Sequence, residues 1–174
     1  KKLLAGLLLV GSVLSFGATQ RVGIEKLVTN ENRDTLYLEE TKKPYSGEVE
    51  RKYPDGKLLG LATVKDGKLN GKSYEYYENG KLKIEENYVN GKSEGVSKVF
   101  YPNGKVKYET PYKNDKKEGV EKFYSENGIL MSEIPFKNDI VIGVAKVYNA
   151  QTGKLEYEEN LVNGKRNGLS KKYY

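Results

Sequence analysis

The 174-residue sequence contains no cysteine, no histidine and no tryptophan. The lack of cysteine and histidine excludes disulfides, thiolate nucleophiles, imidazole bases and the usual zinc ligands. Carboxylate chemistry or a Ser–Lys pair would remain for an enzyme, but no spacing in the sequence joins a nucleophile to a base. We therefore predict that the protein is not an enzyme and has no catalytic residue, no metal site and no cofactor.

Hydrophobic residues are also scarce, at 37% of the chain, whereas 31% of the residues are charged. This composition does not favour a thick, dry core, because a compact domain of this length buries much apolar surface. Glycine and tyrosine are abundant instead, with 19 and 15 copies. The apolar side chains are therefore expected to be spread thinly over an extended structure.

One long apolar run is present, from Leu3 to Leu14. It follows Lys1 and Lys2 and ends in the small-residue stretch "SFGA", an arrangement typical of a cleaved signal peptide. A membrane anchor is the competing interpretation, but the run is shorter than the roughly 20 residues that span a bilayer. We predict a signal peptide over residues 1–17, and hence export to the periplasm, the cell surface or the medium.

The formal net charge falls from +6 to +4 when Lys1 and Lys2 are removed with this segment. Basic and acidic residues are interspersed along the rest of the chain. The sequence therefore predicts a mixed, solvated surface, and a nucleic acid partner is not expected.

An internal repeat is the main signal in the sequence. A leading glycine recurs every 24 residues, with one interval of 25, at Gly47, Gly71, Gly95, Gly119, Gly143 and Gly168. A second glycine marks a first turn in each copy, at Gly56, Gly80, Gly104, Gly128 and Gly153. A second turn falls later in each copy, at Gly67, Gly91, Asp115, Asp139 and Gly164.

Aromatic and aliphatic residues recur at odd distances from the leading glycine. Odd distances share one face of an extended chain, so each repeat is predicted to form two strands with a common apolar face. The predicted structural core consists of the residues about five and eleven positions after each leading glycine: Tyr76, Leu82, Phe100, Val106, Tyr124, Leu130, Tyr148 and Leu155. The residues seventeen positions after the leading glycine are expected on the same face: Val64, Tyr88, Tyr112 and Phe136.

The stretch Tyr-Pro-Asn-Gly at 101–104 predicts a type I turn followed by a left-handed glycine that forms a bulge. This geometry places Phe100 opposite Val106, and likewise pairs the equivalent residues of the other copies. A two-residue turn on Asn-Gly would instead pair aromatic residues with polar neighbours and split the apolar set across both faces. We therefore expect the bulged turn.

The predicted fold is all-β: an elongated, single-layer antiparallel β-meander built from about five to six two-stranded repeats. Strands about 4.8 Å apart would make the sheet roughly 50 Å long. The repeat domain is expected over residues 36–174 and begins with a degenerate half repeat whose strand is Leu36 to Leu38. Residues 18–35 match no copy, and a flexible linker and a short cap on the first strands both remain open.

Copies such as "GKSYEYYENGKLKIEENYVNGKSE" and "GVSKVFYPNGKVKYETPYKNDKKE" resemble the bacterial variant of the MORN repeat, as in antitoxin-component proteins of the YwqK type. The resemblance covers residues 36–174. It departs where Lys52 replaces an aromatic residue and where Asp115 and Asp139 replace turn glycines. It implies an elongated β-sheet module for protein or membrane contacts, and it implies no reaction. The antitoxin role suits a cytoplasmic protein, so the predicted signal peptide argues against a simple transfer of that role.

A column of acidic residues is the first candidate site: Glu85, Glu109, Glu133 and Glu158. Carboxylates on alternate strands would lie about 10 Å apart. This separation is too wide for a retaining glycosidase pair and at the limit for an inverting pair. A solvated face neutralised by nearby lysines is the expected role, and the lysines after the first turns are expected to be solvated too: Lys57, Lys81 and Lys105.

Tyr53, Tyr77 and Tyr101 form the second candidate site, a binding surface. They stand at an even distance from the leading glycine and are expected to be partly exposed opposite the core. Tyrosine is a frequent contact residue in binding surfaces because its ring loses little conformational entropy. A partner-binding strip and a structural role both remain open.

Two non-catalytic functions follow from these observations. An exported scaffold for protein–protein or cell-surface contacts is preferred, because it requires only the leader and the repeats. An antitoxin or immunity protein that neutralises a partner toxin is the alternative. The expected partner is an unidentified protein, and contact with a membrane or cell surface stays open.

Overall fold

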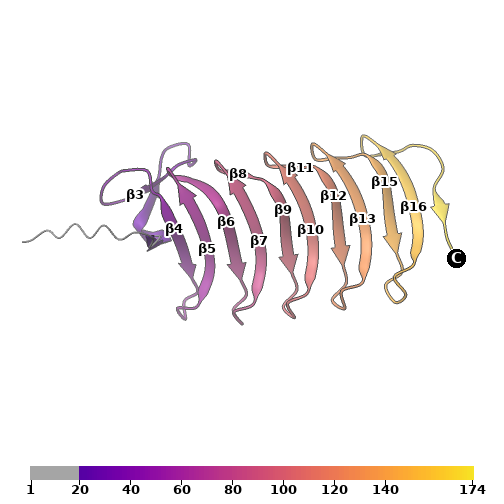
Figure 1. Cartoon of the computed structure of the whole chain (residues 1–174), viewed down its shortest axis with the longest axis horizontal. Coiled ribbons are helices and arrows are strands. Elements are labelled where there is room, and N and C mark those ends of the chain that lie inside the picture. The colour runs from indigo at the N-terminus through magenta and orange to yellow at the C-terminus, as the bar shows by residue number, and fades with distance from the viewer. Residues whose placement is uncertain (1–19) are drawn as a thin grey trace, which may run out of the picture.

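The computed structural model describes residues 20–174 (Figure 1). They form one sheet of 16 strands, a separate two-stranded sheet and one short 3-10 helix. The strands lie side by side nearly in chain order, so the molecule is elongated and one layer thick over most of its length (Figure 1). This arrangement confirms the predicted all-β meander. No helix within residues 20–174 is long and apolar enough to cross a membrane, and the predicted signal peptide lies outside the described residues.

Ten long strands build the repeats, two for each copy. They are β4 (Gly47–Lys52), β5 (Leu58–Lys65), β6 (Lys68–Tyr76), β7 (Leu82–Val89), β9 (Gly95–Phe100), β10 (Val106–Lys113), β12 (Gly119–Tyr124), β13 (Leu130–Lys137), β15 (Gly143–Tyr148) and β16 (Leu155–Val162). Short strands follow the second turns and the last copy: β8 (Lys92–Ser93), β11 (Lys116–Lys117), β14 (Ile140–Val141), β17 (Lys165–Arg166) and β18 (Lys171–Lys172).

The first turns of the first four repeats have the predicted bulged geometry, whereas the turn of the fifth copy is one residue longer and closes with the Gly153 N–H donating to the Asn149 carbonyl. In the third copy the Gly104 N–H donates to the Tyr101 carbonyl at 2.8 Å, and the Tyr101 N–H donates to the Lys105 carbonyl at 2.8 Å. Gly104 has a φ of 92°, a conformation that a side chain would strain. Phe100 pairs with Val106, which confirms the predicted register. The other four turn glycines also have positive φ.

A second irregularity in each hairpin divides the apolar residues between the two faces of the sheet. In the third copy Val106 pairs with Phe100, but Tyr108 pairs with Val99, so one extra residue lies between the two pairs. Such a bulge reverses the alternation of side chains along its strand. Phe100 and Val106 therefore lie on one face, named the ladder face below. Val99, Tyr108 and Tyr112 lie on the other, named the cap face.

The prediction that the residues seventeen positions after the leading glycine, such as Tyr112, share the face of Phe100 is therefore wrong. Tyr112 pairs with Gly95, in the same alternation as Tyr108 and Val99, and the equivalent residues of the other copies pair with their own leading glycines. The physical reason is the second bulge, which shifts the strand by one residue after the first apolar position. The sheet thus has apolar side chains on both faces.

Residues 20–38 form a cap over the cap face of the first repeat. It contains β1 (Arg21–Gly23), the 3-10 helix η1 (Ile24–Lys26), β2 (Leu27–Thr29) and β3 (Leu36–Leu38). Strand β1 pairs in parallel with β4. The predicted strand at Leu36–Leu38 is present, but it pairs with β2 in the separate sheet and does not begin the meander.

The buried hydrophobic core lies under this cap. Val22, Tyr45, Val49 and Val64 are only 2–9% exposed, and Leu27, Leu36, Leu38 and Leu69 pack against them. The Tyr45 hydroxyl donates to the Gln20 carbonyl at 2.9 Å, which ties the cap to the repeats. By contrast, the eight residues of the predicted repeat core are all half-buried cross-strand neighbours. Among residues 20–174 the second layer is present only at this end, and it excludes water from the core.

Candidate interaction surfaces

A row of alternating charges crosses the ladder face perpendicular to the strands. One residue from each of eight neighbouring strands contributes, and each stands directly opposite the next. The row is Glu85, Lys98, Glu109, Lys122, Glu133, Lys146, Glu158 and Lys171. Opposite charges in directly opposed positions stabilise a strand pair. The predicted acidic column is thus part of a mixed ladder.

Each glutamate of this ladder has partners within the sheet. Lys98 lies 3.2 Å from Glu109 and Lys122 lies 3.9 Å from Glu133. Tyrosine hydroxyls of the following repeat donate to the same carboxylates, Tyr124 to Glu109 at 3.1 Å and Tyr148 to Glu133 at 2.6 Å. The expected neutralisation by nearby lysines is confirmed, and the tyrosines add bonds between repeats that the sequence did not reveal.

The tyrosine–glutamate bonds change the acidity of the phenols. The hydrogen bond to Glu133, followed by burial, raises the pKa of Tyr148 to about 12. Burial, followed by the hydrogen bond to Glu109, raises the pKa of Tyr124. A carboxylate that accepts a hydrogen bond from a phenol stabilises the protonated form of that phenol. These hydroxyls therefore stay protonated and act as donors at neutral pH.

The three tyrosines of the candidate binding surface are half-buried at the first-turn edge. Each hydroxyl donates to a carbonyl of the next repeat: Tyr53 to Tyr76 at 2.7 Å, Tyr77 to Phe100 at 2.7 Å and Tyr101 to Tyr124 at 2.8 Å. Tyr53 and Tyr77 also line a shallow groove with Pro102. Their hydroxyls hold neighbouring copies together, and partner binding by their rings stays a prediction.

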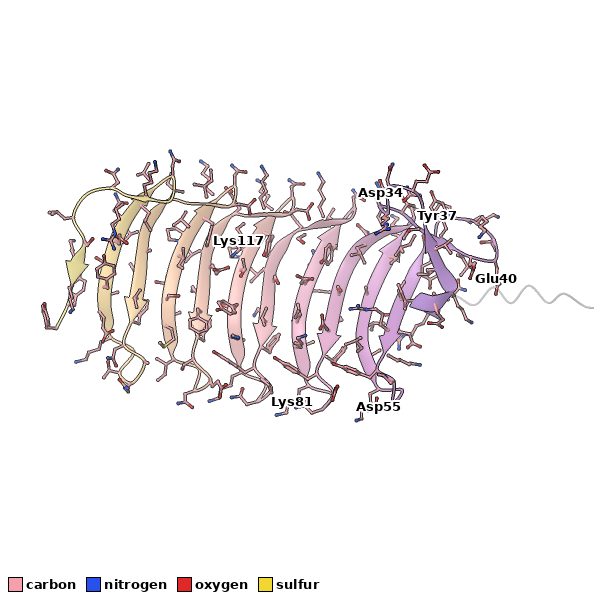
Figure 2. The ribbon with its side chains drawn as sticks, turned by 180° about the vertical axis from the view of Figure 1, so that it is seen from behind. Asp34, Tyr37, Glu40, Asp55, Lys81 and Lys117 are labelled. Carbon is pink, nitrogen blue, oxygen red and sulfur yellow. The ribbon has the colours of Figure 1, made fainter. Side chains whose placement is uncertain are left out.

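Polar side chains project from the same edge into solvent. Asp55 and Lys81 point away from the turns there (Figure 2). Lys57 forms an ion pair with Asp55 at 2.8 Å, and Lys105 Nζ donates to the Asn127 carbonyl at 2.9 Å. Ion pairs this exposed contribute little to stability. The expectation that the turn lysines are solvated agrees with their exposed positions.

The second-turn edge carries another set of bonds between repeats. The Asn114 N–H donates to Glu94 Oε2 at 3.0 Å. The Ser93 N–H donates to Asp115 Oδ1 at 2.7 Å, and the Asp115 N–H returns a bond to the Ser93 carbonyl at 3.1 Å. Asp115 has a φ of 68°, so it takes the left-handed conformation of the glycine that it replaces. The next turn repeats the pattern with Glu118, Lys117, Asn138 and Asp139.

The fourth second turn breaks this polar pattern. Ile140 and Ile142 stand where the two preceding copies have a lysine and a glutamate, and they are 48% and 38% exposed. Val144 and Val162, on the adjoining strands, are 46% and 37% exposed. Large exposed apolar patches commonly mark contact sites. These four residues are named the edge patch below. They were not predicted from the sequence, although "NDIVIG" differs visibly from "GKSEG" and "DKKEG" at the equivalent turns of the two preceding copies.

No cluster of three or more acidic side chains able to hold a metal ion occurs within residues 20–174. The carboxylates of the ladder are separated by lysines; Glu85 is bonded to Lys72, and the other three are bonded to tyrosines. The arrangement offers surfaces for contact.

Comparison with protein families identifies the repeat. The model described as "MORN repeat variant" matches four consecutive segments, residues 45–66, 69–90, 93–114 and 117–138. Each segment covers one first turn and its two strands, and together they make up half of the chain. A search of curated proteins gave no match. On the strength of the family match and the repeated hairpins, the chain belongs to the MORN repeat variant family.

Proposed function

We propose that this chain is an exported, non-catalytic repeat scaffold that holds a protein partner at the edge patch. Membership of the MORN repeat variant family supports a repeat scaffold. The observation that carries the proposal is the exchange of polar for apolar residues at Ile140 and Ile142 in an otherwise regular edge. The exchange has a structural cost. Glu94 and Glu118 each accept a hydrogen bond from a backbone N–H of the next second turn, and the side chain of Ile142 has no acceptor atom.

The charges around the edge patch favour a partner of a particular kind. Lys137 pairs in register with Ile140, and Lys165 pairs with Val162. Within residues 20–174 neither lysine lies within ion-pair distance of a carboxylate. Complementary charge at an interface rim guides encounter and selects partners. A protein surface with apolar side chains flanked by acidic residues fits this site.

The internal repeats supply the variant that tests the proposal. Ile140→Lys with Ile142→Glu restores the residues of the preceding copy. The new glutamate would accept from the Asn163 N–H, as Glu118 accepts from Asn138, so the melting temperature should not fall. A photo-crosslinking residue at position 140 should label one protein in the native host, and the same residue at position 116 should not. Equal labelling from both positions would contradict the proposal.

Export is tested separately. Mature protein from the native host should begin near Ala18 or Thr19, as cleavage after Gly17 or Ala18 predicts. N-terminal sequencing of the protein recovered outside the cytoplasm provides the measurement. Residues 1–17 still attached to a cytoplasmic pool would remove export from the proposal and leave the scaffold function in place.

The alternative function is that of an antitoxin or immunity protein. The resemblance of the copies to antitoxin-component proteins of the YwqK type, which are bacterial, supports it. In this case the partner at the edge patch is a toxin, and a toxin gene beside this one would be expected. Co-expression should restore growth to cells that produce the toxin, and the Ile140→Lys, Ile142→Glu variant should fail to do so.

A further inference from the structure

A cleft of about 450 Å³ lies between the cap and the cap face of the first two repeats. Ile24 and Leu36 of the cap form its roof. Its floor is apolar, with Val49, Val64 and Ile84 among the lining residues. Small-molecule sites in proteins have volumes of roughly 300–1,000 Å³ and mostly apolar walls, so the cleft has the size and lining of a ligand site.

Small residues make the floor deep at this place. Gly60 occupies the repeat position held by Tyr108 and Tyr157 in later copies. Ala62 and Ser73, two further small residues of the floor, stand directly opposite each other. Tyr108 instead fills its position with a ring that stacks on Phe123 at 4.8 Å. The first repeat therefore lacks the aromatic ring that the third and fifth copies have at this position.

Arg51 stands at the mouth of the cleft in a position that is otherwise largely apolar. The second copy has Glu75 there, and the later copies have Val99, Phe123 and Val147. The Arg51 Nη2 and Nε atoms lie 3.3 and 3.4 Å from the point where a Cβ on Gly60 would stand, so the guanidinium extends over the glycine. In the part of the chain from residue 20 onward, no carboxylate lies within ion-pair distance of Arg51.

The two carboxylates that line the cleft do have partners. Glu75 forms an ion pair with Lys83 at 2.7 Å, and Glu86 accepts a hydrogen bond from the Tyr88 hydroxyl at 2.7 Å. Arg51 is thus the charged group of the cleft that is free to bind. A guanidinium binds a carboxylate through two parallel hydrogen bonds.

We propose that this cleft binds a small amphiphile with an apolar tail and a carboxylate head. The tail lies between the roof at Ile24 and the floor at Ala62 and Ile84, and the head binds Arg51. The site is separate from the edge patch at the other end of the sheet, so it adds a small-molecule function to the proposed scaffold and does not depend on it.

Calorimetric titration of the purified chain with decanoate, below its micelle concentration, tests the proposal. Saturable binding at one site is expected. Arg51→Gln should weaken it at least about tenfold, because charge-assisted hydrogen bonds are lost. The matched control is Lys52→Gln, a neighbour on the opposite face that pairs with Glu50, and it should bind as the unaltered chain does.

Two further arms distinguish the cleft from non-specific adsorption. Ala62→Leu should fill the floor and abolish binding while the circular dichroism spectrum is unchanged. Ser73→Val narrows the same floor by less, so it tests the cleft even where the leucine variant does not fold. Decyltrimethylammonium has the same tail and the opposite charge, and it should not bind. Absence of saturable decanoate binding, equal binding of the cationic amphiphile, or undiminished binding by Arg51→Gln would each overturn the proposal.

Discussion

The two ends of the sheet are built from the same repeat but are stabilised in different ways. At the capped end, a second layer buries Tyr45, Val49 and Val64 almost completely. Beyond the cap, Thr110 is the one residue of the described chain that is buried to a similar degree. Most of the large hydrophobic residues that are well exposed lie after residue 139.

This difference shows which interactions stabilise a single-layer sheet where no second layer covers it. Its side chains remain half-exposed, so apolar burial contributes less for each residue. Cross-strand pairs and hydrogen bonds between repeats replace the missing core, as in the ladder of Lys98, Glu109 and Tyr124. Stability in such an array is roughly a sum of repeat and neighbour terms, so the two ends can differ widely.

The largest expected effect comes from truncation in the buried core. Tyr45→Ala removes a ring that is 3% exposed and a hydroxyl bonded to Gln20, and it should destabilise the capped end by about 3–5 kcal/mol. Val141 occupies the same repeat position at the far end and is half-buried, so Val141→Ala should cost about 1 kcal/mol or less. Urea denaturation followed by circular dichroism provides both values. Similar costs at the two positions would refute the contrast between the ends.

Two glycines of the open region should respond differently to the same substitution. Gly119 has a φ of 122°, and a Cβ there would lie 2.8 Å from Pro111 Cγ. Gly104 has a φ of 92° and no atom within 4 Å of the added Cβ. Gly104→Ala should therefore cost only backbone strain, about 1–2 kcal/mol, whereas Gly119→Ala should cost about 3 kcal/mol because a steric clash is added. Thermal melts of the two variants decide the order, and a reversed order would show that the close approach of Gly119 to Pro111 does not constrain the open region.

The smallest expected effect is a dependence on alkaline pH that is confined to the ladder. The hydrogen bond to Glu133 raises the pKa of Tyr148 from 10.0 to about 12. Because the folded-state pKa is the higher one, the stabilisation is complete below about pH 10 and is lost as the pH rises to about 12. Tyr148→Phe should reduce the fall in melting temperature over this interval. Tyr37→Phe in the cap is the control, because no carboxylate within residues 20–174 accepts a hydrogen bond from the Tyr37 hydroxyl, and an equal reduction by both variants would contradict the assignment.

The sequence predicted the features that depend on local chemistry. The glycine spacing gave the period of the repeat, and Pro-Asn-Gly gave the turn that pairs Phe100 with Val106. The lysines that were expected to neutralise the acidic column are also present, as the ladder confirms. Each of these inferences needs only the nearest residues along the chain, because turn geometry and strand alternation are set there.

The features that the sequence did not reveal depend on contacts between distant segments or on unmarked backbone shifts. The second bulge lies at Val106 to Tyr108, where no glycine or proline marks it, so the residues at seventeen were placed on the wrong face. The cap packs Val22 against Val49 and Val64; the sequence left a cap and a linker equally open, because residues 18–35 match no copy of the repeat. The hydroxyl of Tyr77 reaches a carbonyl 23 residues away, which only the three-dimensional register discloses.

Hydrogen exchange measured along the full chain by mass spectrometry tests the central claim most directly. The account predicts a gradient, with the slowest exchange in β4 and β5 under the cap and progressively faster exchange through β10 to β15 and β16. The gradient should flatten in Tyr45→Ala, because that substitution removes the core that anchors one end. Uniform protection from β4 to β16, or slowest exchange in β15 and β16, would contradict the view that this array is anchored by its capped end.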